Sequence, residues 1–551
     1  MARHPTPPSG PPDAVRQQPR RARAARARGS GAAPFRADPA RRAAYDVLRA
    51  VADRDSYANL LLPALLAERG LTGRDAAFAT ELTYGTLRGR GTYDAILAAC
   101  SDRDQVDPPV QDILRLGAHQ LLATRVGRHA AVATSVDLVK DVCGPRPSGF
   151  VNAVLRRVAT RDLEGWLAIV APDRAQDPSG YLAVRHSYPP WIVDSFRVAL
   201  GDAADTELED ALAAGNVRPD VVLAVMPGEP GPSGLPEPGQ SAVRTQWSPY
   251  GLRLAGGDPA PLVAAGQAAV QDEASQLAAL ALTRVEPAGA ASQDRLWLDL
   301  CAGPGGKARL LAALAAGRGA RLVASDLRPH RARKVLRALR RARPARASDS
   351  AVNDSAVNDS AVNDSAVVVA DGLRVPWPPG TFDRVLADVP CSGLGSLRRR
   401  PEARWRKTPA AVPGLARLQR GLLNAALDSV RLGGVVAYVT CSPHVAETRD
   451  VITSVADRRG DVTILDAPAV LAEVPGLRAS EPKAPQTSET LQPSETPQPP
   501  EPSEPPETSQ GAETPQGASP SAPDPRWARF AQFWPHRHGT DAIFLALLRR
   551  G

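Results

Sequence analysis

Several residue types are scarce in this chain of 551 residues, and each scarcity excludes a class of protein. The five cysteines include no Cys-x-x-Cys pair, which argues against a zinc knuckle, and an odd, sparse set is typical of reduced thiols. No apolar run reaches the ~20 residues of a membrane helix. No apolar stretch follows the basic N-terminus, which argues against a secretory signal. We therefore expect a cytoplasmic protein without a membrane anchor or a metal site.

Aromatic residues and lysine are scarce as well. At 4% aromatic content, Tyr188 and Trp191 are expected to pack in the core, with stacking on nucleic-acid bases as the alternative. Only five residues are lysine, so arginine supplies most of the positive charge. The formal net charge is +8, which favours a polyanionic partner.

Three stretches have the composition of low-complexity segments rather than of packed domains. Residues 1–37 are rich in Pro, Arg, Ala and Gly and predict a disordered basic tail, which either contacts phosphates or is merely solvated. Residues 347–366 contain three copies of Ala-Val-Asn-Asp-Ser and predict an expanded surface loop. Residues 481–525 are dominated by Pro, Glu, Ser and Thr and predict a disordered acidic insertion.

Residues 38–165 have the pattern of an all-helical domain, with apolar side chains at helical spacing. The stretch resembles the NusB-like RNA-binding domain. The resemblance rests on four segments in order, 41–48 (RRAAYDVL), 81–88 (ELTYGTLR), 131–136 (AVATSV) and 150–157 (FVNAVLRR). It implies a domain that binds RNA, for example through Arg88 and Arg156, or one that only packs against a catalytic neighbour.

The rest of the chain predicts α/β structure. Residues 166–265 are interpreted as an α/β connecting region that takes part in RNA binding. Residues 266–550 alternate short β runs with helical stretches, which predicts a Rossmann-like, largely parallel sheet with helices on both faces.

A glycine-rich turn follows the first predicted strand of the last domain, 296–300. Its glycines let the backbone approach a ligand, and the helix that begins near Lys307 presents free N–H groups to an anionic group. The spacing is neither Gly-x-Gly-x-x-Gly nor a Walker motif. The turn consists of Cys301, Ala302, Gly303, Pro304, Gly305, Gly306 and Lys307.

Acidic residues end the predicted strands beside this turn. Asp299 ends the first strand, Asp326 ends the second, where it can bind ribose hydroxyls, and Asp371 follows the third, placed to meet an adenine edge. This pattern favours S-adenosylmethionine over a dinucleotide, with Lys307 as the partner of its carboxylate and Arg331 as a further contact. The simpler alternatives are turn stabilisation for Asp299 and a solvated Lys307.

Two cysteine segments follow apolar runs further along the chain, 388–395 (DVPCSGLG) and 438–443 (YVTCSP). Both cysteines are predicted at strand ends in polar loops, which makes a purely structural role for them improbable. A cofactor turn followed by two such cysteines indicates covalent catalysis by a thiolate. Cys301 is expected to serve packing, and Cys100 and Cys143 have no evident role.

With all these segments in order, the chain from about 40 to 550 resembles the RNA 5-methylcytosine methyltransferases of the Nol/Nop/Sun family. Its RsmB (Sun, Fmu) type carries a NusB-like domain ahead of the catalytic one, and segment 534–544 (WPHRHGTDAIF) is similar to the family's final motif. The resemblance implies S-adenosylmethionine-dependent methylation of cytosine C5 in ribosomal RNA of the small subunit. It gives Cys441 as the nucleophile, Cys391 as the residue that assists product release and Asp388 as the partner of N3 and a cofactor contact.

The residues alone leave the two cysteine roles open, because a Pro-Cys segment supplies the nucleophile in DNA cytosine methyltransferases, which would favour Cys391. One departure concerns the loop after Cys441, where family members often carry a Glu-Asn pair and this chain has Glu447-Thr448. That departure puts the local support of the loop in doubt rather than the chemistry.

Two basic clusters are candidates for RNA contact. Residues 328–341 carry cations at helical spacing, which we interpret as a solvated face. Residues 398–407 follow the Asp388 loop and are predicted to hold phosphates at the mouth of the site. We expect a monomer that acts on single-stranded or loop RNA, since the target base must be unpaired to reach a thiol. The alternatives are a non-catalytic RNA-binding or ribosome-assembly factor and a small-molecule methyltransferase.

Overall fold

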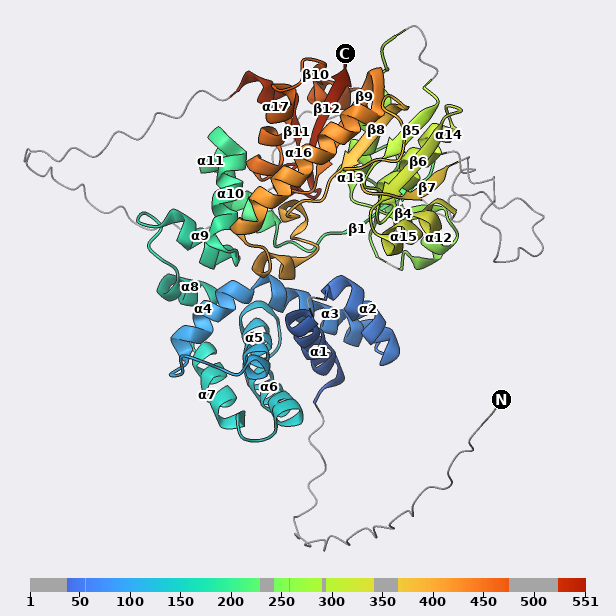
Figure 1. The fold of residues 1–551 in the computed structure, drawn as a ribbon. Helices are drawn as coiled ribbons and strands as arrows, with labels where there is room; N and C mark the ends of the chain where they lie inside the picture. Colours follow the sequence, from blue (N-terminus) through green and yellow to red (C-terminus); the bar gives the residue numbers. More distant parts are fainter. Residues whose placement is uncertain are drawn as a thin grey trace, which may run out of the picture.

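The computed structural model describes residues 37–54, 56–227, 242–256, 258–289, 294–340, 365–474 and 524–551. They form a helical domain, a connecting region and a sheet domain (Figure 1). The low-complexity segments predicted at 1–37, 347–366 and 481–525 lie outside the described residues, apart from their last one or two positions. Within the described part of the chain, no helix has both the length and the apolar character needed to cross a membrane.

The N-terminal domain is all-α, as predicted. Its first helix buries Ala44, Val47, Leu48 and Val51, the positions whose spacing predicted a helix. The fifth begins at Pro108, where the missing N–H group costs no helical hydrogen bond. The helices are α1 (Pro39–Arg54), α2 (Ala58–Glu68), α3 (Gly73–Arg88), α4 (Arg90–Cys100), α5 (Pro108–Ala123), α6 (Arg128–Cys143), α7 (Ser148–Val158) and α8 (Leu163–Val170).

The connecting region combines helices with a small antiparallel sheet, in agreement with the predicted α/β character. Its strands lie in the order β2-β3-β1-β4. Tyr188 is buried here between helices, as expected of a core residue. The elements are α9 (Pro178–His186), α10 (Pro190–Leu200), α11 (Ala204–Ala214), β1 (Val221–Val225), β2 (Ala242–Arg244), β3 (Gly251–Leu254), α12 (Ala260–Ala264) and β4 (Ala268–Val270).

The sheet domain has the predicted Rossmann-like fold, with strands in the order β10-β12-β9-β8-β5-β6-β7. The strands from β9 to β7 run parallel, while β12 is antiparallel to both β9 and β10. The strands are β5 (Leu296–Asp299), β6 (Arg321–Asp326), β7 (Ala366–Val369), β8 (Phe382–Asp388), β9 (Val430–Thr440), β10 (Val462–Leu465), β11 (Ala531–Gln532) and β12 (Phe544–Arg550).

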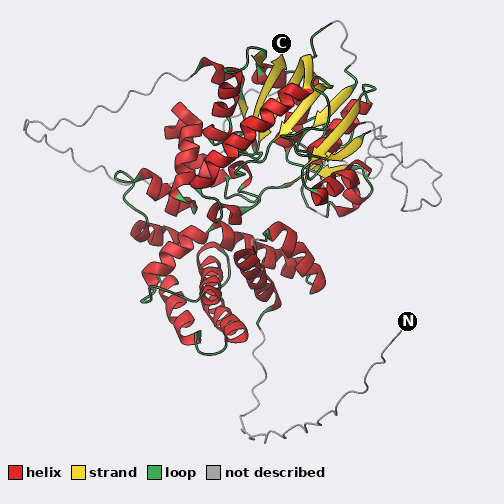
Figure 2. Cartoon of the chain, in the orientation of Figure 1, coloured by secondary structure: helices red, strands yellow, loops and turns green. Residues whose placement is uncertain are grey.

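Helices cover both faces of this sheet (Figure 2). Because successive strand residues point to opposite faces, Val435, Ala437 and Val439 of β9 pack with α13, α14 and α15, whereas Val436 and Tyr438 pack with α16 and α17. The helices are α13 (Glu273–Arg284), α14 (Gly306–Ala316), α15 (Pro329–Arg340), α16 (Val412–Ser429), α17 (Arg449–Ala456), α18 (Ala467–Ala472) and α19 (Pro535–His538).

The short helix Pro401–Trp405 of the sheet domain joins the three parts of the molecule. The guanidinium of Arg404 is fully buried and donates to the carbonyl oxygens of Arg88, Ser187 and Gly215. It also stacks on the ring of Tyr188, 3.7 Å from the centroid. These contacts involve the ends of α3, α9 and α11, so one arginine holds the helical domain and the connecting region against the sheet domain.

The prediction that residues 398–407 form a phosphate-binding surface is therefore wrong for most of the segment. Arg406 donates to the carbonyl oxygens of Val51 and Ser56 in the helical domain. Arg398 and Arg399 form ion pairs with Asp272 and Asp541. Their positive charge is neutralised inside the protein, which composition alone does not reveal.

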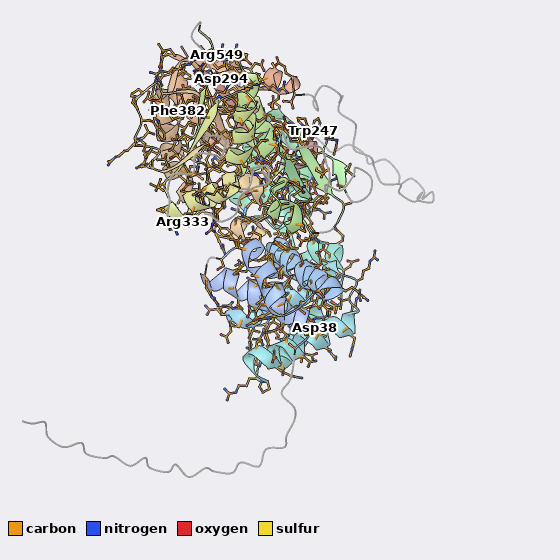
Figure 3. All side chains as sticks on the ribbon, turned by 90° about the vertical axis from the view of Figure 1, so that its right-hand side faces the viewer. Asp38, Trp247, Asp294, Arg333, Phe382 and Arg549 are labelled. Carbon is orange, nitrogen blue, oxygen red and sulfur yellow. The ribbon has the colours of Figure 1, made fainter. Side chains whose placement is uncertain are left out.

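The predicted solvated face of α15 fits the structure better. Arg333, Lys334, Arg337 and Arg340 are exposed, and none has an ion pair among the described residues. Arg333 lies at the end of the sheet domain that faces the helical domain (Figure 3).

Substituting Arg404→Ala should loosen the joint, because it leaves three buried carbonyl groups without their donor. We expect a loss of about 3 kcal/mol or more, seen as a lower apparent melting temperature and a larger radius of gyration in small-angle scattering. Arg400→Ala is the matched control, since Arg400 is exposed over the ring of Tyr57. Equal melting temperatures for the two variants would contradict this role of Arg404.

Candidate active site

The glycine-rich turn is pressed against the end of β6. A side chain at Gly303 would lie 2.4 Å from Oδ2 of Asp326 and 2.6 Å from Nε of Arg331, so only glycine fits. The N–H of Gly303 donates to Asp326 over 3.0 Å, and Arg331 donates to the carbonyl oxygen of Gly303. Arg331 also pairs with Asp326 at 3.3 Å. The structure thus brings these three predicted cofactor residues together.

Acidic residues from neighbouring strands form a row at the carboxyl edge of the sheet. Because β8, β5, β6 and β7 are adjacent and parallel, Asp388, Asp299, Asp326 and Asp371 follow one another along that edge. Asp371 lies two residues after β7 and caps the N–H of Leu373 at 2.9 Å. Ligands of α/β sheets bind at this edge, so the predicted cofactor residues occupy a suitable place.

Lys307, at the start of α14, forms an ion pair with Asp388 across 2.9 Å. The lysine side chain is 13% exposed. Burial opposes its positive charge, but the carboxylate of Asp388 outweighs this effect and raises the pKa of Lys307. Lys307 is therefore a fixed cation rather than the solvated lysine of the alternative interpretation.

Asp299 is the most unusual carboxyl group in the row. It is 1% exposed, and neither of its oxygens accepts a hydrogen bond of normal geometry from a described residue. The N–H of Cys301 lies close enough to stabilise the carboxylate in part. Burial, together with the nearby charge of Asp388, raises the pKa of Asp299 to about 8.

The two predicted catalytic cysteines meet at the ends of β8 and β9. The sulfur atoms of Cys391 and Cys441 lie 3.2 Å apart, and both side chains are half-buried. The contact raises the pKa of Cys391 well above its ordinary value, helped by burial and by the charges of Glu447 and Asp388. The same contact lowers the pKa of Cys441, and Lys307 acts in the same direction. The two thiols thus share one hydrogen bond, in which either sulfur can be the donor, and the charges around them differ.

The other cysteines lie apart from this pair. Burial raises the pKa of Cys301, the largest cause of its shift, so the thiol in the glycine-rich turn stays protonated. Cys100 and Cys143 belong to the helical domain.

Sequence reasoning missed the acidic residues that support the two cysteine loops. Glu447 is fully buried and contacts the serines that follow both cysteines. Asp541 and Asp272 hold Arg398 and Arg399. The position of Glu447, six residues after Cys441, was visible in the sequence. Its contacts depend on two loops that are 50 residues apart in the chain, so no local pattern indicates them.

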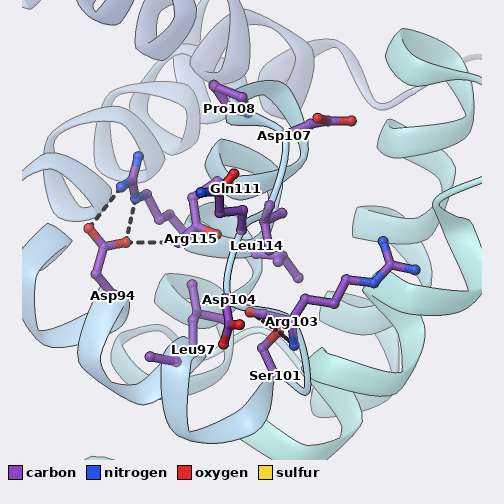
Figure 4. A pocket seen from close by; sticks show the side chains of 13 residues that line it. Asp94, Leu97, Ser101, Arg103, Asp104, Asp107, Pro108, Gln111, Leu114 and Arg115 are labelled. Atoms are coloured by element: carbon purple, nitrogen blue, oxygen red, sulfur yellow. Dashed lines mark hydrogen bonds and ion pairs between the residues drawn. The ribbon is translucent and has the colours of Figure 1, made fainter.

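A cavity of about 610 Å³ lies in the helical domain, away from Cys391 and Cys441 (Figure 4). Arg115 and Arg103 line it together with Asp94, Asp104 and Asp107. Asp94 accepts hydrogen bonds from Arg115 at 2.6 and 2.8 Å, which neutralises that cation. The balance of charge gives this cavity no particular affinity for phosphate.

Comparisons with known proteins agree with this geometry. Residues 288–549 match the family model described as 16S rRNA methyltransferase RsmB/F, and residues 38–160 match the NusB family. The chain is 45% identical to the putative methyltransferase Rv1407 of Mycobacterium tuberculosis over 531 residues, which cover 95% of this chain and 99% of the relative.

More distant similarities point the same way. The chain is 31% identical to the probable ribosomal RNA small subunit methyltransferase B of Synechocystis sp., covering 74% of this chain and 86% of that one. The solved structure titled "Crystal Structure of PH0851" superposes with a TM-score of 0.65 at 19% identity and covers 94% of this chain and 99% of that one, which supports the fold.

Ionisation of Asp299 should make stability depend on pH. An aspartate in an unfolded chain has a pKa of about 4, whereas Asp299 in the folded protein has a pKa of about 8. The folded protein therefore holds a proton on Asp299 that the unfolded chain has lost over this range. As a result, the free energy of unfolding falls as the pH rises from about 4 to about 8, by at most about 1.4 kcal/mol per pH unit. Asp299→Asn lacks this titration. The melting temperature of the variant relative to wild type should rise between pH 5 and pH 8, and a constant difference would show that Asp299 titrates normally.

Proposed function

Because this chain belongs to the 16S rRNA methyltransferase RsmB/F family, we propose that it methylates cytosine C5 in small-subunit ribosomal RNA through a covalent cysteine adduct. The observation that supports the proposal most directly is the contact between Cys391 and Cys441, 3.2 Å apart beside the Lys307–Asp388 ion pair. A binding protein has no need for two cysteine thiols in contact at the carboxyl edge of a sheet.

The methyl donor is S-adenosylmethionine, whose methyl group is electrophilic because it is attached to a positively charged sulfonium. The described residues fit this cofactor. Asp299 offers two buried carboxyl oxygens without regular hydrogen bonds, which suits a cationic ligand. Lys307 would supply the cation for the cofactor's carboxylate, Asp326 would bind the ribose hydroxyls, and Asp371 would meet the adenine edge.

The chemistry assigned to the protein begins at Cys441. Its thiolate adds to C6 of the cytosine, and the electron pair of the C5–C6 double bond becomes available at C5. C5 would then take the methyl group, whose bond to the sulfonium sulfur breaks with the electron pair staying on that sulfur. Asp388, at the end of β8, contacts N3 and stabilises the charge that develops on the ring. Loss of the C5 proton to solvent restores the double bond as the S–C6 bond breaks.

Cys391 acts in the last step. The two sulfur atoms share a hydrogen bond, and a proton on Cys391 stabilises the sulfur of Cys441 as it leaves C6 as a thiolate. The target cytosine must be unpaired or extruded to reach the thiol, so we propose a single-stranded or loop region of ribosomal RNA as the substrate. The helical domain and the connecting region are the parts proposed to hold that RNA.

The test compares wild type with Cys441→Ala and Cys391→Ala in methyl transfer from labelled S-adenosylmethionine to small-subunit ribosomal RNA. We expect Cys441→Ala to reduce the formation of 5-methylcytosine at least ~10³-fold, because it removes the attacking atom. Cys391→Ala should accumulate a covalent protein–RNA adduct, visible as a band of reduced mobility in a denaturing gel.

Cys143→Ala is the matched control, since this half-buried thiol lies in the helical domain. An adduct in Cys441→Ala and none in Cys391→Ala would reverse the two roles. RNA binding without label in any wild-type reaction would instead favour the alternative of a non-catalytic assembly factor.

A further inference from the structure

The carboxyl group of Glu447 connects the two cysteine loops. Glu447 ends the short helix Val445–Glu447 after β9 and is fully buried. Its Oε1 accepts the N–H of Ser392 at 2.7 Å, and its Oε2 accepts the hydroxyl of Ser442 at 2.7 Å. Ser392 and Ser442 are the residues that directly follow Cys391 and Cys441, so a single carboxyl group fixes the distance between the two thiols.

Further contacts complete this arrangement. The hydroxyl of Ser392 also donates to Oε2, and the amide of Gln419 donates to Oε1 at 3.1 Å and to the carbonyl oxygen of Pro390 at 2.9 Å. The two serine hydroxyls lie 3.0 Å apart because they converge on the same oxygen. Four donors around one carboxyl group are the pattern of an ionised carboxylate.

This charge has no cationic partner. All four donors are neutral groups, and no ion pair of Glu447 occurs among the described residues. A buried charge without an opposite charge acts strongly on its neighbours because little solvent screens it. Cys391 lies in the loop that Glu447 contacts, whereas Lys307 offsets the charge felt by Cys441.

We propose that Glu447 is a positioning residue that holds the two cysteine loops in register and, through its buried charge, keeps Cys391 protonated as the donor to Cys441. This proposal depends on the proposed function only for the catalytic roles of Cys391 and Cys441. The charged groups that face the pair are Glu447 and Asp388 at Cys391, and Asp388, Asp541 and Lys307 at Cys441. Glu447 accepts both the backbone N–H and the hydroxyl of Ser392 in the Cys391 loop, but only the hydroxyl of Ser442 in the Cys441 loop.

The experiment measures the ionisation of each thiol without RNA or cofactor. Full-length wild type and Glu447→Gln are treated briefly with iodoacetamide between pH 6 and pH 10, and mass spectrometry gives the initial rate at each cysteine. In wild type, Cys441 should react at a lower pH than Cys391. In Glu447→Gln, the profile of Cys391 should move to lower pH, and its rate relative to Cys441 at pH 7.5 should rise about 10-fold, which corresponds to one pKa unit.

Controls separate the charge of Glu447 from its structural role. Glu402→Gln replaces another buried glutamate, in the joint between domains, and should leave both profiles unchanged. Glu447→Asp keeps the charge but shortens the side chain, so Cys391 should still titrate well above Cys441. General loosening would instead speed both thiols at every pH without moving either midpoint.

Two results would overturn the proposal. One is a Cys391 profile in a folded Glu447→Gln protein that coincides with wild type. The other is a pH midpoint for alkylation of Cys391 that falls to the midpoint of Cys441 in the Glu447→Asp variant. This second result can be measured even if the Glu447→Gln variant does not fold. Since alkylation requires no substrate, neither result bears on whether Cys441 is needed for methylation, so this proposal and the proposed function fail separately.

Discussion

The side chains of Lys307 and Asp388 start from different strand ends and meet at 2.9 Å. Lys307 follows the turn after β5, and Asp388 ends β8, its parallel neighbour. Their ion pair fixes the start of α14 relative to the Pro-Cys loop, and its positive end favours the thiolate of Cys441. Burial makes the pair costly unless both charges remain matched, so the cofactor turn and the cysteine loops are constrained to form together.

Around this pair the site is organised by opposed charges. Lys307 favours an ionised Cys441 against the charges of Asp388 and Asp541, while Glu447 and Asp388 disfavour an ionised Cys391. The two sulfur atoms are chemically identical and 3.2 Å apart, so only their surroundings can give them different roles. The charges around the two sulfur atoms differ, while the catalytic roles proposed for the two cysteines follow from the family resemblance.

The parts of the molecule that could be predicted from sequence are those fixed by local patterns. The glycine-rich turn, the acidic residues at strand ends and the cysteine segments each follow an apolar run, and parallel pairing then brings them to one edge. The burial of Arg404 and the contacts of Glu447 could not be predicted. Arg404 is covered by Arg88 and Tyr188, which belong to other parts of the chain, and Glu447 joins loops 50 residues apart. A basic run or a single glutamate looks the same in the sequence whether solvent or protein surrounds it.

The position of β12 has a consequence for how the protein folds. This strand pairs with β9 from Phe544 opposite Thr440 to Arg549 opposite Val435, and so covers the side of the strand that ends at Cys441. Until residues 544–550 arrive, β9 is an edge strand with apolar side chains and unpaired backbone groups, the kind of surface that recruits other chains. Closing this pair joins segments about a hundred residues apart, a slow, non-local event. The strand that ends beside Cys441 is thus among the last to be protected, and loss of the final strand would lead to aggregation.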